Sequence, residues 1–540
     1  MVWAIGGPGN MFALDPMRVR EDGGRQIASL LFDGLVTLDR NEHVEPWGAQ
    51  SWTISPDGLT YTFKLRVHQR FSDGAPVTAS DYAWSIDRAA HTCSGSQVAD
   101  DLAAIKGADV LSGYSCDGGT SETTLIGRSI RADDSANTLT ILLTRPAPYF
   151  LSVLATTAGM ALERRVVEKH VLYGSNPAAD DAFLPVLSTG PTGQGGSGMF
   201  YLAKSSTSAI NSPGSLALKQ NPYWWGGSSG RLPWIKTIDI TVPSADVAFS
   251  QFSSDPSQAF ANSFPTDQPL AQYTQQPYYH EQPTLGFHGL MFYWRNAPFN
   301  DINARKAFCL AINRVQLNQQ VYHGQTLPSW HIVPQGMDGY DSGLKGLDGT
   351  PITGDVSLAK HYWQLYLAAH NNQVPPIVIN YGYPNNSRDL AVSAWLQNTW
   401  NQAFGPDTAS IDRSEWGHGP GWQNSRQIVG FGLRADDADP QNILSWFAEL
   451  NSGNVDGSPQ IDVLAADALM RQADALSDMR QRIPLYQQAE QLLIDNVVVC
   501  PLYQTVNHYA LRPWVKGGFA EDARGLFPND AWVSGYIAKH

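Results

Sequence analysis

The chain has 540 residues, of which 43% are hydrophobic and 16% charged, and its formal net charge is -14 at pH 7. This length exceeds one ordinary core, so we expect two or three domains or large lobes. The acidic balance and the lack of any Lys/Arg run exclude nucleic acid and anionic membrane as favoured partners. No apolar run approaches the ~18 residues of a membrane-spanning helix.

The first ten residues, MVWAIGGPGN, lack the basic segment and the apolar segment of a signal peptide. We therefore expect either a cytoplasmic protein or an exported one whose leader has been removed.

Four cysteines leave the compartment open. Cys93 and Cys116 flank a polar stretch, and a disulfide between them is expected if the protein is exported. Buried free thiols are the default expectation for Cys309 and Cys500. Since the chain has no CxxC motif, zinc fingers and thioredoxin-type redox motifs are unsupported.

The clearest local prediction is a strand followed by a capped helix. Residues 61–67 alternate between apolar and polar side chains, which predicts a strand with one buried face. After a Ser-Asp-Gly turn, Thr78 is a predicted N-cap with Asp81 in the capping-box position, and Val77 and Tyr82 are placed as a hydrophobic staple. A helix is therefore expected to begin near Ala79.

Later segments show both periodicities. Strands are predicted at 137–144, after the glycine cluster of 187–198, and in the run VVVCPLYQTV near the C-terminus. Helices are predicted at 300–317 and 483–496 from the spacing of their apolar residues. This mixture favours α/β or α+β lobes.

Two motif matches are rejected on context. Gly193-x-Gly195-x-x-Gly198 fits a dinucleotide fingerprint, but a strand rather than a helix follows it. The segment 226–230 fits a nucleophile elbow without the required strand-to-helix setting. There is no Walker A loop, no HExxH and no ligand spacing among the 13 histidines, so no cofactor or metal is predicted.

One polar cluster is singled out, in the segment RADDADPQN at 434–442. Asp436, Asp437 and Asp439 follow a predicted strand, where a carboxylate could face a crevice. The competing interpretation is a turn whose carboxylates cap the next helix. Paired carboxylates could also indicate a glycosidase, and the 17 tryptophans would suit sugar stacking.

A long motif gives a further line of evidence. The stretch GAQSWTISPDGLTYTFKLRVHQRFSDGAPVTASDYAWSIDRA, residues 48–89, resembles a signature of the family 5 extracellular solute-binding proteins, the peptide-binding components of ABC importers. Further matching pieces follow in family order: LFDGLVTLD at 31–39, NPYWWGG at 221–227, APFNDINARKAFCLAINR at 297–314 and RPWVKGG at 512–518.

The resemblance implies a two-lobed α/β fold of the periplasmic-binding-protein type (type II, cluster C) with an additional domain. Lobe one would comprise residues 1–50, 190–290 and 505–540, the extra domain 51–189, and lobe two 291–504. It also implies export, either as a free periplasmic protein or with a lipid anchor on the outer face of the cytoplasmic membrane. A monomer is expected.

The resemblance also implies site residues. Asp436 matches the aspartate that pairs with a peptide's α-ammonium. Leu433 replaces the tryptophan that some members have, and Arg434 lies beside it. The partner of the peptide carboxylate varies across the family and is not carried over from it, and Arg413, Arg426 and Arg434 are the candidates in this sequence. The segment around Asp33 and Gly34 matches one that offers backbone hydrogen bonds to an extended peptide.

The leading prediction is therefore a protein that captures short peptides between two lobes and delivers them to an ABC transporter permease, without catalysing a reaction. An oligosaccharide or nickel-chelate ligand for the same kind of importer component is a second hypothesis, and a secreted glycosidase is a third. Ligand binding is predicted to close the lobes.

Overall fold

A computed structural model shows how the chain folds. It describes residues 1–5, 14–19, 22–39, 43–91, 95–112, 124–168, 195–205, 215–229, 233–243, 245–262, 264–265, 268–294, 296–381, 386–411, 427–448, 463–517 and 536–538. The contacts divide the chain into two compact units. Unit 1 comprises Met1–Pro265, Gln275–Gln282 and Asn507–His540, and unit 2 comprises Thr266–Thr274 and Pro283–Val506.

The first core of unit 1 is built on a mixed sheet. Its strand β1 (Val2–Ala4) runs parallel to both of its neighbours, and the strand order is β17-β11-β1-β10-β9-β8. The other bounds are β8 (Phe200–Ser205), β9 (Ser215–Gln220), β10 (Thr237–Thr241) and β11 (Gln258–Ala261). Alternate residues of these strands, such as Ile238 and Ile240 of β10, are fully buried. Together with α1 (Asp22–Leu31) they enclose one hydrophobic core.

A second core in unit 1 contains the predicted strand and capped helix. The antiparallel sheet β4-β5-β7-β6 consists of β4 (Ala49–Ile54), β5 (Thr60–Leu65), β6 (Ile130–Asp133) and β7 (Thr138–Leu142). Helix α2 (Ala79–Ala90) packs in the same hydrophobic core. The capping box between Thr78 and Asp81 is present, so this prediction is confirmed.

Shorter elements complete unit 1. They are β2 (Val36–Leu38), β3 (Val44–Pro46), α3 (Ala108–Ser112), α4 (Phe150–Leu154), η2 (Thr157–Gly159), α5 (Arg164–Val167), η4 (Trp225–Ser229), α7 (Ala245–Ser254), β18 (Val515–Lys516) and β19 (Tyr536–Ile537).

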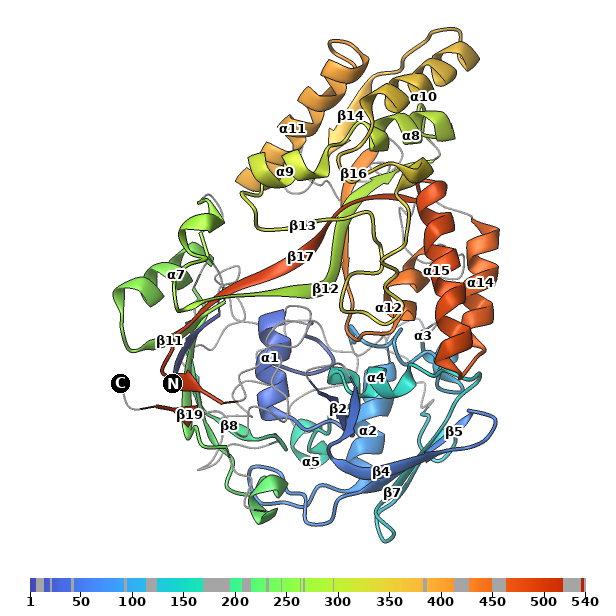
Figure 1. Cartoon of the computed structure of the whole chain (residues 1–540). Coiled ribbons are helices and arrows are strands. Elements are labelled where there is room, and N and C mark those ends of the chain that lie inside the picture. The colour runs from blue at the N-terminus through green and yellow to red at the C-terminus, as the bar shows by residue number, and fades with distance from the viewer. Residues whose placement is uncertain are drawn as a thin grey trace. The chain divides into compact units, whose positions relative to one another are not determined.

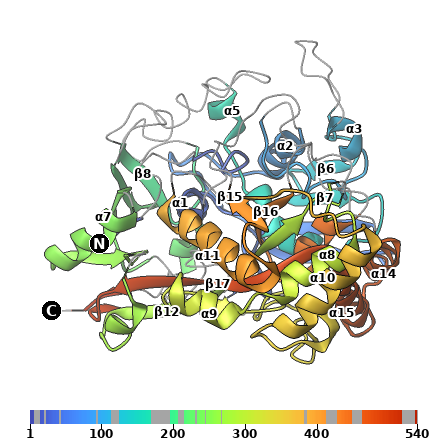
Figure 2. The same ribbon diagram turned by 90° about the horizontal axis from the view of Figure 1, so that it is seen from above.

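Unit 2 is also α/β. Its sheet has the order β15-β14-β16-β12-β17, in which β14 (Ile377–Asn380) runs parallel to β15 (Ala409–Ile411) and to β16 (Ile428–Arg434). Helices α8 (Ile302–Leu310) and α10 (Val356–Ala369) lie side by side in both views, as do α14 (Leu464–Asp474) and α15 (Met479–Asp495) (Figures 1 and 2). The remaining elements are η5 (Leu270–Gln272), α9 (Arg314–Gln320), β13 (Leu327–Pro328), η6 (Leu347–Gly349), α11 (Ser387–Phe404), α12 (Pro440–Leu444) and η8 (Ser445–Phe447).

Two long strands belong to both units. β12 (Tyr279–Phe292) and β17 (Val499–Leu511) are neighbours in the sheet, and each passes from one unit into the other (Figure 1). The predicted α/β character is thus observed. The three-part division into two lobes and an extra domain stays a prediction, since the contacts give two units.

The predicted helix at 300–317 is two helices. Asp301 caps α8 by accepting the Asn303 N–H, and Asn313 caps α9 by accepting the Gln316 N–H. The apolar spacing runs through the break because both helices bury their apolar side chains, so periodicity alone did not reveal the second cap.

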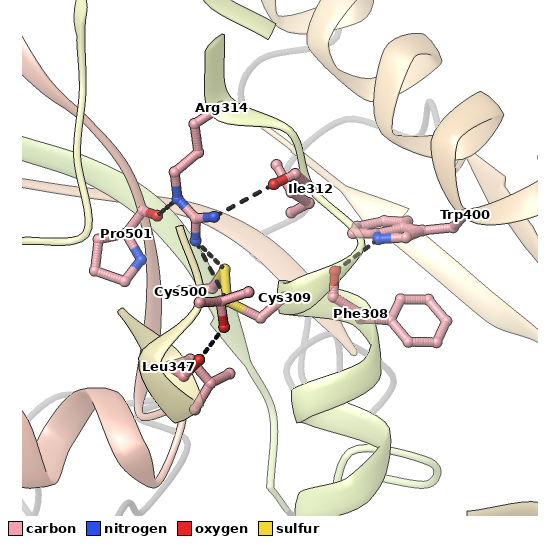
Figure 3. The surroundings of a disulfide bond; sticks show 9 residues. Phe308, Cys309, Ile312, Arg314, Leu347, Trp400, Cys500 and Pro501 are labelled. Carbon is pink, nitrogen blue, oxygen red and sulfur yellow. Dashed lines mark hydrogen bonds between the residues drawn. A yellow bond between two sulfur atoms is a disulfide. The ribbon is translucent and has the colours of Figure 1, made fainter. Parts of the chain in front are cut away.

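The expectation of free thiols at Cys309 and Cys500 is wrong. The two cysteines form a disulfide between α8 and β17, with their Cα atoms 5.7 Å apart (Figure 3). The buried guanidinium of Arg314 contacts this bridge, 3.3 Å from the Cys500 sulfur, and lies 3.3 Å from the ring centroid of Trp330. The sequence could not reveal the pairing because 191 positions separate the cysteines. Cys93 and Cys116 lie outside the described residues.

Candidate functional site

The acidic cluster lies in the turn that follows β16. Leu433 and Arg434 end this strand and are half-buried, and the next residue, Ala435, donates its N–H to the Leu285 carbonyl at 2.8 Å. Asp436 is therefore the first residue beyond the strand pairing. Its side chain is half-buried.

The three aspartates of the turn have different roles. The Asp439 carboxylate accepts the Gln441 N–H at 2.9 Å and is the N-cap of α12. The Asp437 carboxylate accepts the Asp439 N–H at 2.8 Å. Asp436 instead donates its backbone N–H to the Asn442 side-chain carbonyl at 3.2 Å. The capping interpretation is thus confirmed for Asp439, and Asp437 braces the turn.

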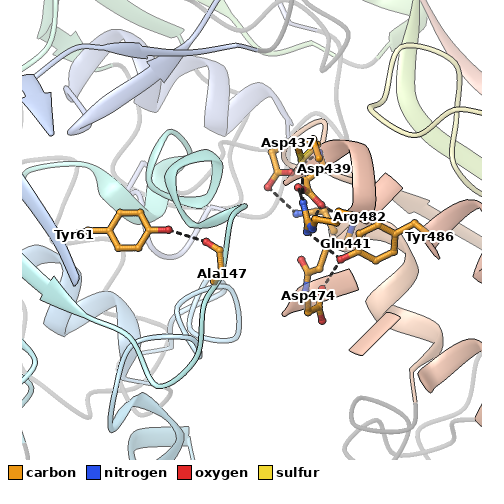
Figure 4. Close-up of polar contacts among 10 residues, drawn as sticks. Tyr61, Ala147, Asp437, Asp439, Gln441, Asp474, Arg482 and Tyr486 are labelled. Carbon is orange, nitrogen blue, oxygen red and sulfur yellow. Dashed lines mark hydrogen bonds and ion pairs between the residues drawn. The ribbon is translucent and has the colours of Figure 1, made fainter. Parts of the chain in front are cut away.

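An ion pair that sequence reasoning missed holds this turn. Arg482 of α15 binds the Asp439 carboxylate through both terminal nitrogens, one of them at 2.9 Å (Figure 4). Arg482 is fully buried and shares the buried face of α15 with Tyr486, Ala489 and Leu493. A charged residue among the apolar positions of a helix indicates an ionic partner. Arg482 could have been singled out in the sequence on this ground.

β16 continues beyond its partner on one side. Its pairs with β14 end at Asn380 and Val429, whereas its pairs with β12 continue to Arg434. Because the Ala435 N–H points to β12, the alternation of an antiparallel ladder directs the N–H and C=O of Gly432 away from β12. Gly432 is exposed, and within the described part of the chain nothing hydrogen-bonds to these two groups.

Aromatic side chains line the face of β16 at its glycines. A Cβ on Gly432 would lie 2.5 Å from the His288 imidazole, and a Cβ on Gly430 would lie 2.8 Å from the Tyr381 ring. Burial lowers the pKa of His288, and its ring stacks on Tyr503 with centroids 5.3 Å apart. The glycines therefore let aromatic rings approach the strand.

The Asp33 side chain lies in the core of unit 1. Its carboxylate accepts hydrogen bonds from three indole N–H groups, those of Trp47 at 2.8 Å, Trp224 at 2.9 Å and Trp225 at 2.8 Å. Burial raises the pKa of Asp33 to about 7, although the indole donors and Arg66 oppose the rise. The carboxylate thus ties η4 to the turn between β3 and β4.

The backbone around Asp33 and Gly34 is largely engaged within unit 1. The Asp33 N–H donates to the Ser197 hydroxyl at 2.9 Å, and the Asp33 carbonyl accepts the Ala161 N–H at 3.0 Å. The Gly34 carbonyl accepts the Gly48 N–H at 3.0 Å. Backbone pairing of this segment with a peptide stays a prediction.

Arg413 and Arg426 lie outside the described residues. Within the described ranges, no group of three or more His, Cys, Asp or Glu side chains could hold a metal ion, and no helix is long and apolar enough to cross a membrane.

Two bacterial binding proteins align with most of this chain. It is 26% identical to the oligopeptide-binding protein OppA of Bacillus subtilis (strain 168), over 91% of this chain and 85% of that protein. It is 25% identical to the probable deoxycholate-binding periplasmic protein YgiS of Escherichia coli (strain K12), over 94% and 88%.

Solved structures show the same fold. The murein tripeptide binding protein MppA of Escherichia coli matches with a TM-score of 0.75 at 22% identity, over 100% of this chain and 99% of that one. OppA of Listeria monocytogenes bound to peptide matches with a TM-score of 0.73 at 20% identity, over 100% and 99%. The predicted two-lobed periplasmic-binding-protein-like fold is therefore confirmed.

The family described as bacterial extracellular solute-binding proteins, family 5 Middle, matches residues 43–454. Since this match spans most of the chain, the protein belongs to the family 5 bacterial extracellular solute-binding proteins.

Proposed function

We propose that this protein binds short peptides outside the cytoplasmic membrane and delivers them to the permease of an ABC importer. It acts as a monomer, free or lipid-anchored, and catalyses no reaction. Relatives named as oligopeptide-binding and dipeptide-binding proteins support a peptide ligand, and the family is one of solute-binding proteins.

The end of β16 carries this proposal. Gly432 is an exposed residue whose N–H and C=O point away from β12, and pairing of these groups with an extended ligand would be the strand-addition mode of peptide recognition. Four residues later, Asp436 offers a carboxylate on a half-buried side chain. Main-chain groups that pair with a peptide backbone and a carboxylate that pairs with its α-ammonium suit a ligand recognised by its backbone and its N-terminus.

The two other aspartates of the turn serve the fold instead. The Asp439 carboxylate caps α12 and pairs with Arg482, and the Asp437 carboxylate accepts the Asp439 N–H within the turn. This division does not suit a glycosidase, which needs two carboxylates facing the same bond.

Asp436→Asn is the decisive variant. An α-ammonium that leaves water needs a compensating charge, so the substitution should weaken binding of free-amine tripeptides by roughly 2 to 5 kcal/mol, the range for breaking a buried charge pair. The measurement is equilibrium dialysis against a mixed tripeptide pool, with mass spectrometry of the bound fraction. Asp407→Asn, in the exposed turn after α11, is the matched control and should bind like the wild type.

Acetylating the N-termini of the pool completes the cycle. Acetylation should cause a similar loss in the wild type and little further loss in Asp436→Asn, because both changes delete one interaction. Additive losses would contradict a contact between Asp436 and the ammonium. Deoxycholate, which has no ammonium group, is the second ligand to test because of its named relative. Tight binding of deoxycholate, with no tripeptide bound, would overturn the peptide proposal.

A further inference from the structure

We infer that Arg482 positions Asp436 for ligand binding, through a chain of contacts that runs from α15 to the turn after β16. This inference rests on the proposed function, since it assigns Asp436 the ligand's ammonium. Arg482 would not touch the ligand and is a positioning residue.

The first link is the pair between Arg482 and Asp439. Arg482 is 0% exposed and Asp439 8% exposed, and both terminal nitrogens of the guanidinium donate to the carboxylate. Two parallel charge-assisted bonds fix the relative orientation of both planar groups as well as their distance. The N-terminus of α12, which Asp439 caps, is thereby fixed to α15.

The second link joins Asp439 to Asp436. Asp439 donates its N–H to Asp437, and Asp437 accepts the side-chain amide of Asn442 at 3.2 Å. The carbonyl oxygen of that amide accepts the Asp436 N–H at 3.2 Å. Each contact fixes the next residue, so a displacement of Asp439 would shift the backbone from which the Asp436 carboxylate projects.

Arg482 itself is held on its other side. Its guanidinium donates to the Tyr486 hydroxyl at 3.0 Å, and that hydroxyl donates to Asp474 at the end of α14 (Figure 4). Burial and the nearby carboxylate of Asp474 raise the pKa of Tyr486, so the phenol stays protonated and remains a donor. The turn after β16 is thus tied to the α14–α15 pair.

A purely structural role would explain the same contacts, but it fits their energetics less well. A buried ion pair contributes little net stability compared with apolar side chains of similar volume. What it supplies instead is a defined geometry, and the geometry it defines here is that of the turn that carries Asp436.

Arg482→Lys tests the inference in the full chain, with Arg305→Lys as the matched control. Lysine keeps the charge but cannot make the two parallel bonds. Arg305 is also buried in unit 2, where it donates to the backbone carbonyls of Phe299 and Asn496. Both variants should lower the melting temperature. Only Arg482→Lys should lower the preference for free-amine over acetylated tripeptides, by roughly tenfold.

Tyr486→Phe provides a milder change, because it removes the two hydrogen bonds of the hydroxyl, with Arg482 and with Asp474, and leaves the ion pair of Arg482 in place. The preference should fall less than in Arg482→Lys. In the Asp436→Asn background neither substitution should change the preference further. An unchanged preference in Arg482→Lys, with a preference present in the wild type, would overturn the inference and leave the proposed function intact.

Hydrogen exchange of the segment 435–442 tests the positioning without any ligand. Arg482→Lys should speed exchange of the Asp436 and Asp439 amides relative to Arg305→Lys. Equal exchange in the two variants would overturn the inference. A wild type that does not distinguish free from acetylated tripeptides would instead overturn the role of Asp436 in the proposed function, so the two failures are distinguishable.

Discussion

Asp33 and Glu490 are two buried carboxyl groups that accept hydrogen bonds from uncharged N–H donors. Asp33 is surrounded by indole N–H donors, as described above. Glu490 on α15 is fully buried, and one of its oxygens accepts the N–H groups of Ile332 at 2.7 Å and Val333 at 2.8 Å. Burial raises the pKa of Glu490 to about 8 in spite of these donors. Such groups make the stability of the protein depend on pH.

Glu490→Gln should remove one part of that dependence. A carboxyl whose folded pKa exceeds its unfolded value stabilises the native state at low pH, and this contribution is lost as pH rises through the folded pKa. Below pH 6.5, His331 also titrates, since burial lowers its pKa to about 4. Its imidazole lies 3.8 Å from the Glu490 carboxylate, so the substitution changes its surroundings and its contribution does not cancel. The clean window is therefore pH 6.5 to 8.

In that window the stability of Glu490→Gln relative to the wild type should rise by roughly 2 kcal/mol. Glutamine keeps the acceptor for both backbone N–H groups, and the other titrating carboxyls are common to both proteins and cancel. Denaturant unfolding at several pH values measures the difference. A difference that does not change with pH would contradict a buried, titrating Glu490.

At the scale of the element, the capping box of α2 gives a local prediction. The Thr78 hydroxyl accepts the Asp81 N–H at 3.3 Å, and the Asp81 carboxylate accepts the Thr78 N–H at 2.9 Å. Thr78→Ala should weaken the first turn by about 1 kcal/mol, which speeds hydrogen exchange of its amides roughly fivefold. Thr78→Ser keeps the hydroxyl and should exchange like the wild type. Equal exchange in both variants would mean that tertiary packing, not the cap, holds this turn.

The disulfide between α8 and β17 makes the second prediction at this scale. It closes a loop of 191 positions, so replacing both cysteines with alanine should cost on the order of 5 kcal/mol by loop-closure reasoning. Denaturant unfolding of the variant and the wild type gives this difference. Because Cys309 and Cys500 are 1% and 0% exposed, reductant should cleave the bridge in denaturant but not in the native protein. Peptide mapping that finds both thiols free in the oxidised protein would refute the disulfide between Cys309 and Cys500.

At the scale of the whole molecule, the connections between the two units predict a conformational change. The chain passes between unit 1 and unit 2 at residues 265–266, 274–275, 282–283 and 506–507. Few connecting segments permit hinge motion, and the proposed capture of a peptide between two lobes requires the lobes to close on it. Small-angle scattering should show a smaller radius of gyration with the free-amine tripeptide pool than without it. Confirmed binding at an unchanged radius would rule out closure.

The sequence by itself determined the features that depend on neighbouring residues. The strand and capped helix of 60–90 follow from period-two alternation and from a cap and its partner three positions apart. Capping of a helix by the carboxylates of 434–442 was one of the interpretations that the sequence left open, and an aspartate followed by proline at the first helical position is a local signal for it. The family motifs are likewise continuous stretches, so the fold class could be predicted.

Only the tertiary structure decided the features whose partners are distant in sequence. Arg482 meets Asp439 across 43 positions, and Cys309 meets Cys500 across 191. Trp224 reaches Asp33 from 191 positions away, so the Asp33 side chain is a contact in the core, which the sequence did not indicate. The burial of a side chain depends on which distant segments pack around it, and no local sequence pattern indicates those segments. The pKa of a carboxyl group and the pairing of a cysteine depend on this packing as well.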